Sequence, residues 1–301
     1  MITSVIGKIF LSAYNSKYGT NYDAKTFFVE VFYPLFFDHP KYMMTAGNSP
    51  LENPKLSWDD MIMGKKSYET AVRRKERFDK LIDKIETCEP DASIALGYPS
   101  IDYMATTSGQ VSNIKLGTTI DDVYLSWIGG GLGVGVQGGM SILFNSPEIL
   151  LDIQEGWSLY REVLNRMPLL KGNQINTWNG QWLAHRYKNG FKPSLPMANL
   201  NPFSTRDGTI SIDTQSWTKL LIGISRTFTS PQLMGYVYNY GQTNITIGFI
   251  PFALSQINRA LDLYQKFFGM DNGEKAEQLY GTAFGFAKAW STPPRPFRRA
   301  S

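Results

Sequence analysis

The spacing of apolar residues changes along the chain, and this change constrains the fold more than any other feature of the sequence. Near the N-terminus, apolar residues such as Ile2, Ile6 and Ile9 recur every three or four positions. That spacing predicts an amphipathic helix, which Gly19 can end. Between about residues 92 and 145, apolar residues fall instead in short runs separated by Gly, Ser and Thr, a pattern typical of β-strands. The chain therefore has to combine helices with a sheet.

Further elements follow from the same rules. Asp23 can cap a second helix that Pro34 should kink or end, and Ser146 followed by Pro147 marks the start of a helix that runs to about residue 165. The segments 39–60 and 172–206 lack a clean period and are expected to be irregular. The remaining helices are predicted at about 65–86, 214–225, 254–268 and 274–290, and the strands at about 94–96, 111–116, 123–128, 140–144, 237–240 and 243–252.

These elements predict the α+β class, with a central antiparallel or mixed sheet built from about residues 92–145 and 236–252 and surrounded by helices. The length of 301 residues permits one large domain or two modest ones. No linker or internal repeat divides the sequence, so residues 1–291 are expected to form a single α+β domain. Residues 292–301 are rich in Pro and Arg and are expected to form a basic extended tail.

Cysteine content and hydropathy exclude two classes of protein. Cys88 is the only cysteine, so a secreted fold held by intrachain disulfides is excluded and a reducing cytoplasm is the expected location. The N-terminus has no charged region ahead of its apolar residues and does not resemble a signal peptide. The most apolar stretch, Phe27 to Phe37, is too short to span a bilayer and is interrupted by Glu30 and Pro34. No membrane association is expected.

A glycine-rich segment at residues 129–139 contains the G-x-G-x-x-G pattern of dinucleotide sites, at Gly133, Gly135 and Gly138. In such sites a helix opens at the third glycine, because its N-terminus binds the pyrophosphate. Here the sequence continues as a strand over residues 140–144. We therefore expect a kinked or bulged hairpin, or a backbone surface pressed against a flat neighbour, and no nucleotide cofactor.

Histidine and cysteine are too few to suggest a zinc site. The two histidines, His39 and His185, have no second ligand three or four residues away, and Cys88 lies in no reactive motif.

Magnesium needs only oxygen ligands, so acidic residues leave room for a metal-dependent enzyme. Asp91 follows a proline at the start of the β region, and Lys115 lies about two dozen residues later. This order resembles the P-D…(D/E)-x-K arrangement of restriction-type nucleases, in which two acids hold magnesium and the lysine supports the attacking water. Asn113 stands in place of the second acid, so Asp121 or Asp122 would have to replace it. The resemblance implies Asp91 and Lys115 as catalytic residues and Asp91 as a metal ligand, with Mg²⁺ as cofactor.

The segment 172–192 is rich in amides and aromatic residues with interleaved cations. Amides can bind base edges, aromatic rings can stack on bases, and cations can neutralise phosphates. The same residue types suit a sugar, and the tryptophans could equally belong to the core. The nucleic-acid contacts predicted in this segment are Trp178, Trp182, Arg186, Lys188 and Lys192.

The helix predicted at 65–86 has one apolar face and one face rich in cations. Arg73, Arg74, Arg77 and Lys80 lie on the charged face and are predicted to bind nucleic acid, although such faces are commonly just solvated. The net charge of +4 permits a polyanionic partner without requiring one.

Three functions remain open from the sequence. The leading prediction is a protein that binds DNA or RNA, as a component of a prokaryotic defence (antiviral) or processing assembly. The second is a magnesium-dependent endonuclease of the kind described above. The third is a non-catalytic subunit that binds other proteins through exposed aromatic residues.

Overall fold

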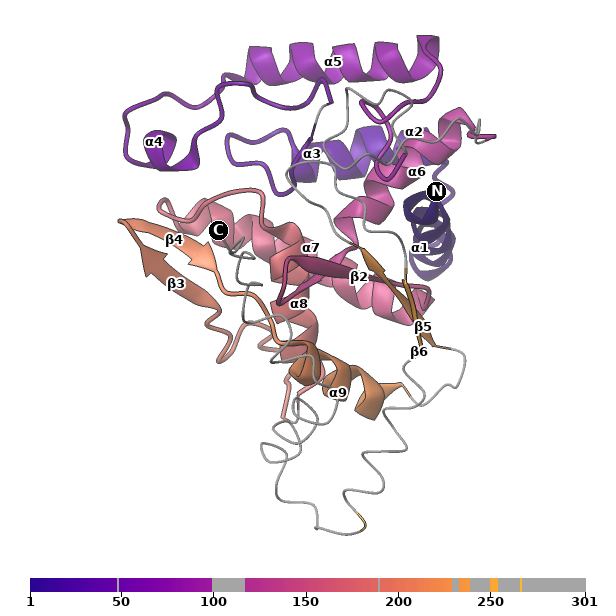
Figure 1. Cartoon of the computed structure of the whole chain (residues 1–301), viewed down its shortest axis with the longest axis vertical. Coiled ribbons are helices and arrows are strands. Elements are labelled where there is room, and N and C mark those ends of the chain that lie inside the picture. Colours follow the sequence, from indigo (N-terminus) through magenta and orange to yellow (C-terminus); the bar gives the residue numbers. More distant parts are fainter. Residues whose placement is uncertain are drawn as a thin grey trace, which may run out of the picture.

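The computed structural model describes residues 1–47, 49–98, 117–188, 190–228, 233–238, 250–253 and 266 (Figure 1). Helices and small antiparallel sheets alternate along the chain, which confirms the predicted α+β class, although the larger sheet has four short strands and is not clearly central. The helical elements are α1 (Ile2–Tyr18), α2 (Ala24–Phe27), the π-helix η1 (Phe28–Phe32), α3 (Tyr33–Phe36), α4 (Trp58–Ile62), α5 (Ala71–Thr87), α6 (Ile120–Gly131), α7 (Pro147–Arg166), α8 (Ile175–Arg186) and α9 (Trp217–Thr227).

The larger sheet has the strand order β1-β2-β5-β6, and all its pairs are antiparallel. Its strands are β1 (Val134–Val136), β2 (Met140–Phe144), β5 (Met234–Tyr238) and β6 (Ile250–Ala253). A separate hairpin joins β3 (Phe203–Arg206) to β4 (Thr209–Ile212). The strands predicted at 140–144 and near 236–252 are therefore confirmed for the residues described, whereas residues 239–249 lie outside them.

The glycine-rich segment divides between a helix and a hairpin. Residues 129–131 end α6, and β1 and β2 form the expected hairpin with a turn at residues 137–139. The hairpin backbone presses directly on α8: a Cβ added at Gly180 would lie 2.2 Å from the carbonyl oxygen of Gly135. This close contact, and not a ligand, explains the need for glycine at both positions.

The prediction of a strand at residues 123–128 is wrong, because these residues form the middle of α6. Their run of apolar residues is buried on all sides, and such a run has no period that separates strand from helix. The deciding feature is a capping box, in which Thr119 accepts a hydrogen bond from the backbone N–H of Asp122 and the Asp122 carboxylate accepts one from the backbone N–H of Thr119. The strand predicted at 94–96 is also wrong, since that segment is a series of turns.

α6 packs closely against α1 through glycines on both helices. A Cβ at Gly129 would lie 2.0 Å from the carbonyl oxygen of Thr3, and one at Gly7 would lie 2.1 Å from that of Leu125. Glycine costs helix stability, but here it permits a backbone separation that alanine would prevent.

The second predicted helix is present, but Pro34 does not end it. Asp23 caps its start by accepting a hydrogen bond of 2.7 Å from the backbone N–H of Thr26. The helix then widens into η1, and α3 continues it through Pro34 to Phe36. A π-turn lets a helix pass a residue that lacks an N–H and would clash with the preceding turn.

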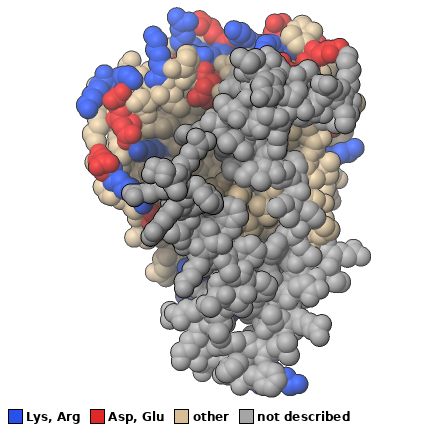
Figure 2. All heavy atoms as spheres, in the orientation of Figure 1, with Lys and Arg blue, Asp and Glu red and all other residues tan. Residues whose placement is uncertain are grey.

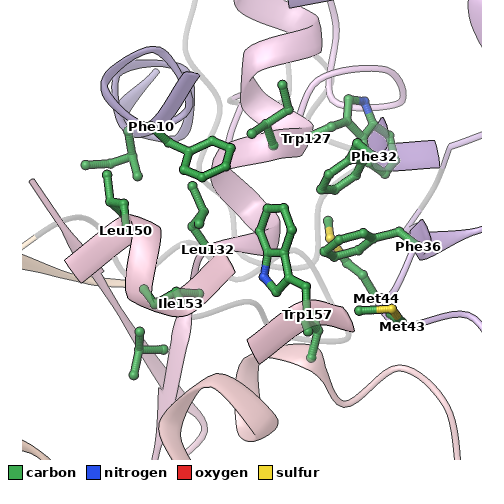
Figure 3. Packing of buried hydrophobic residues seen from close by; sticks show 14 of the residues in the cluster. Phe10, Phe32, Phe36, Met43, Met44, Trp127, Leu132, Leu150, Ile153 and Trp157 are labelled. Carbon is green, nitrogen blue, oxygen red and sulfur yellow. The ribbon is translucent and has the colours of Figure 1, made fainter. Parts of the chain in front are cut away.

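The core is aromatic and joins the first helices to α6 and α7 (Figure 3). The ring of Trp157, from α7, lies 4.8 Å from that of Phe36 and 5.6 Å from that of Phe10, centroid to centroid. Each fully buried ring of this kind stabilises the fold by about 2–3 kcal/mol relative to exposure. The abundance of Phe and Trp in the sequence is thus explained in large part by packing.

Some of the remaining predicted segments lie within the described residues and others do not. The segment 172–206 was expected to be irregular but contains α8, and the helices predicted at 65–86, 147–165 and 214–225 correspond to α5, α7 and α9. The predicted strand 111–116, nearly all of the predicted helix 254–268, all of the helix 274–290 and the predicted tail 292–301 lie outside the described residues. The boundary of the predicted single domain therefore stays a prediction.

Candidate nucleic-acid interface

The cations on the outer face of α5 are paired with acids of the same helix. Arg73 bonds Glu76 at 3.0 Å, and Lys75 bonds Asp79 one turn further on. Figure 2 shows the result, with basic and acidic side chains interleaved along the top of the molecule, where Figure 1 places α5. Of the four predicted contact residues on this helix, Lys80 alone is exposed without a partner in the described part of the chain.

The two inner arginines of α5 are structural. Arg74 is only 10% exposed and binds Asp38 at 3.1 Å and the backbone carbonyl of Glu69 at 2.8 Å. Arg77 binds the Glu69 carboxylate, which is 7% exposed and also accepts a hydrogen bond of 2.6 Å from the hydroxyl of Tyr42. A phosphate could bind Arg77 only by displacing a nearly buried carboxylate, and it could bind Arg74 only by displacing Asp38 or a backbone carbonyl from a guanidinium that is itself nearly buried. The predicted role of these two residues therefore does not fit their geometry.

A small pocket lies between α5 and the core. Its volume is about 10 Å³, room for about one water molecule, whereas sites for small molecules usually begin at about 300 Å³. Its lining residues are Tyr33, Phe37, Tyr42, Leu51, Arg74 and Arg77.

Trp178 and Trp182 belong to the core, which corrects the prediction that they stack on bases. They are 0% and 1% exposed, and α8 holds them against α7. The Trp178 indole N–H donates to the carbonyl of Gly156 at 2.8 Å, and that of Trp182 donates to the carbonyl of Asp152 at 2.7 Å. With both ring faces packed, neither indole can take a base without unfolding part of the core.

The amides of the same segment bind the protein's own backbone. The side-chain NH₂ of Asn179 donates to the carbonyls of Gly131 and Gly133, both at 2.9 Å. Gln174 accepts from the backbone N–H of Ile212 at 2.8 Å. These groups hold the glycine hairpin and β4 to α8, so they are not available to bind base edges.

Arg186 is the centre of an ion-pair network that joins α8 to α7. Its guanidinium lies 2.6 Å from a carboxylate oxygen of Asp152 and 2.8 Å from one of Glu155, and Glu155 also binds Lys17 of α1 at 2.8 Å. Asp152 accepts a further hydrogen bond of 2.7 Å from Tyr187. Burial, reinforced by this carboxylate, raises the pKa of the Tyr187 phenol far above its usual value. Arg186 is therefore neutralised, like the inner arginines of α5.

Four other cations lie on or just after the two elements that meet where α9 packs on the end of α8, and we call them the α8–α9 cation group. α9 packs closely there through Gly223, where an added Cβ would lie 3.2 Å from the Cβ of Tyr187. None of the four has a carboxylate partner among the described residues. The group consists of Lys188, Lys192, Lys219 and Arg226, of which Lys188 is half-buried and the others are exposed.

Two members of this group, Lys219 and Arg226, were missed in the sequence. They are seven residues apart on α9, which places them on the same face about 10.5 Å apart along the helix axis. The predicted helix 214–225 could have revealed Lys219, but its predicted end lay one residue before Arg226. They are brought towards Lys188 by the contact between α8 and α9 at Gly223, and the spacing of residues along the sequence does not predict this contact.

The nuclease residues are not brought together in the described structure. The Asp91 carboxylate accepts hydrogen bonds of 2.6 Å from both the backbone N–H and the hydroxyl of Ser93, in a turn. Lys115 lies outside the described residues, and Asp122 is used in the capping box of α6. Throughout the described ranges, no three His, Cys, Asp or Glu side chains are grouped as metal ligands.

Comparisons with known proteins give no relative: no family model matches the chain, and no curated protein or solved structure matches it significantly. None of the helices in the described part of the chain is long and apolar enough to cross a membrane.

Proposed function

We propose that the chain is a nucleic-acid-binding protein whose phosphate contacts come from the α8–α9 cation group. The observation that carries the proposal is the lack of carboxylate partners among the described residues for Lys188, Lys192, Lys219 and Arg226, which lie on α9 or just after α8, two helices that pack together at Gly223 and Tyr187. Unpaired cations bind phosphates without first losing an ion pair, and each such contact releases a condensed counterion.

The proposed interface binds without sequence preference. Trp178, Trp182 and the amides of Gln174 and Asn179, which could have distinguished bases, are used in the fold. Lysine and arginine side chains on phosphates carry no sequence information. Each cation that contacts a phosphate contributes about −0.9 to the slope of log affinity against log salt for duplex DNA, or about −0.7 for a single strand. Contacts by all four predict a slope of about −3 to −4.

The test compares two triple variants with the same change in charge. In the first, Lys188, Lys192 and Lys219 are replaced by Gln; in the matched control, Arg73, Lys75 and Lys80 of α5 are replaced by Gln. Fluorescence anisotropy measures the affinity for labelled single- and double-stranded DNA and RNA across a salt series. We expect the first variant to lose about 30-fold in affinity at low salt and about three units of slope, and the control to lose about twofold or less.

Two outcomes would contradict the proposal. Equal losses in the two variants would mean that only net charge matters, and the α8–α9 cation group would have no special role. Absence of binding by the unmodified protein at the lowest salt would exclude nucleic-acid binding and leave the third function, a protein-binding subunit.

The alternatives have less support in the described residues. The same binding experiment with Mg²⁺ tests the nuclease, since cleavage that Asp91→Ala abolishes would establish it. Exposed apolar residues such as Val5, Val72 and Leu195 lie on separate elements, and single exposed residues of this kind are normal on any surface. The role within a prokaryotic defence or processing assembly and the cytoplasmic location stay predictions.

A further inference from the structure

His185 lies beside the α8–α9 cation group, three residues before Lys188, whose backbone N–H donates a hydrogen bond of 3.4 Å to the carbonyl of His185. It is 6% exposed, on the last turn of α8, and its ring packs edge-on against Phe191 with 5.6 Å between centroids. One ring nitrogen, Nε2, lies 2.9 Å from the backbone carbonyl of Pro196, in the segment that carries Lys192. The histidine therefore connects the helix to this segment.

The charges around the ring are arranged against its protonation. Burial lowers the pKa of His185 below its usual value, and the positive charges of Lys188, on the same segment, and of Lys219, on α9, lower it further. The nearest cation on α8 itself, Arg186, is neutralised by Asp152 and Glu155 of α7. The two lysines, which have no carboxylate partner among the described residues, therefore add to the effect of burial on the ring.

We propose that His185 takes up a proton when the phosphate backbone of a nucleic acid binds Lys188 and Lys219, so that binding at this surface tightens as the pH falls. The inference rests on the proposed function. Phosphates on the two lysines cancel the positive field that, in addition to burial, disfavours the charged imidazole, and linkage requires that a ligand which favours protonation is itself favoured by protons. The protein thereby acquires an affinity for nucleic acid that depends on pH in the range where histidine titrates.

The hydrogen bond of His185 is compatible with this change of charge. Because a carbonyl can only accept, Nε2 of His185 is the donor, and it remains a donor when the ring is protonated. His39 differs: its Nδ1 accepts a hydrogen bond of 3.0 Å from the backbone N–H of Lys41 and lies 3.2 Å from the carbonyl of the same residue, so protonation would exchange the first contact for the second. The chain's second histidine therefore provides an internal control.

The experiment uses the full chain, whose two histidines give two sets of imidazole signals in NMR. The pKa of His185 is measured with and without a saturating DNA oligonucleotide at low salt, in the unmodified protein and in the double variant Lys188→Gln, Lys219→Gln. We expect DNA to raise the pKa of His185 by about half a unit or more, and to leave His39 unchanged. We expect the double variant, without any DNA, to show a raised pKa of His185, because the positive field is gone.

Affinity gives an independent readout. If DNA raises the pKa of His185 by half a unit, the protein should bind DNA about threefold more tightly at pH 5 than at pH 7.5. The variant His185→Gln, whose amide can still donate to the carbonyl of Pro196, shows the pH dependence caused by all other groups, and it should lack this threefold difference. DNA binding with an unchanged pKa of His185 would overturn the inference and leave the proposed function intact. Absence of DNA binding would overturn both, and a double variant with an unshifted His185 would show that the two lysines do not act on the ring.

Discussion

α5 and the α8–α9 region both carry several cations, yet they differ in what those cations are bound to. On α5, Arg73, Arg74, Lys75 and Arg77 each bind a carboxylate, and Lys80 is the exception among the residues predicted to bind nucleic acid there. Around the contact of α8 with α9, four cations have no such partner in the described structure. The density of basic residues in a sequence is therefore a poor measure of an anion-binding surface, because carboxylate partners decide how many of the cations are free to bind an anion.

The difference has a physical origin in both local and distant sequence. On α5, Glu76 and Asp79 lie three or four residues after a cation, the spacing at which side chains meet on a helix. Asp38 and Glu69 reach the helix from outside it. On α9, no acidic residue lies between Lys219 and Arg226, so neither has a partner on its own helix.

The largest expected effect separates structural cations from unpaired ones. Arg77→Gln would leave the Glu69 carboxylate nearly buried without its charged partner, and we expect a loss of about 3 kcal/mol in the free energy of unfolding. Lys219→Gln removes an exposed cation without a carboxylate partner and should change stability by less than about 0.5 kcal/mol. Urea denaturation at pH 7 measures both.

Arg186→Gln serves as a control for this prediction. It removes the partner of Asp152 and Glu155, which are more exposed than Glu69, and should lower the free energy of unfolding by about 1–2 kcal/mol. A loss for Lys219→Gln as large as that for Arg77→Gln would show that the α8–α9 cations also hold the fold together, and the comparison would fail.

One histidine lies next to each of these two regions: His39 next to the ion pairs of α5, and His185 at the end of α8. His39 follows Asp38, the partner of Arg74, and burial together with the charge of Arg161 lowers the pKa of His39 to about 4. The unfolded chain binds a proton near pH 6.5 and the folded protein does not, so stability is lost as the pH falls from about 6.5 towards 4. We expect His39 to account for about 2 kcal/mol of this loss, after allowance for its partial exposure.

Urea denaturation of the unmodified protein and of His39→Asn, at intervals between pH 4.5 and 7.5, measures that share. Asn can still accept the backbone N–H of Lys41 but does not titrate, so its curve should be flatter in this window. Parallel curves for the two proteins would show that another group causes the loss.

Sequence reasoning succeeded where a local signal decides the structure. Asp23 and Ser146 begin helices as predicted, and Gly19 ends the first one in the left-handed conformation that favours glycine. It failed where a run was apolar on every side, as at residues 123–128. It also failed to distinguish Trp178 in the core from a tryptophan on the surface, because composition gives the number of aromatic rings but not what packs against them.

The candidate site depended even more on tertiary structure. Lys188 and Lys192 were predicted from their own segment, but Lys219 joins them only through the contact of Gly223 with Tyr187. The pairing of Arg74 with Asp38 spans 36 residues, so no local pattern could have shown that this arginine is already neutralised.

The smallest expected effect comes from unpairing the cations of α5. In the double variant Glu76→Gln, Asp79→Asn, Arg73 and Lys75 lose their partners while both acids are replaced by amides of similar shape. Exposed pairs contribute little, so we expect stability to change by less than about 0.5 kcal/mol. If pairing is what distinguishes the two regions, the freed cations should raise the affinity for a DNA oligonucleotide about twofold to fourfold at low salt, and make its salt dependence steeper by one to two units. Glu162→Gln, which frees Arg166 on α7, controls for the added positive charge elsewhere, with one acid removed instead of two. If the gain in affinity per removed acid were the same in this control and in the α5 variant, net charge would set the affinity. The distinction between the two regions would then carry no functional meaning.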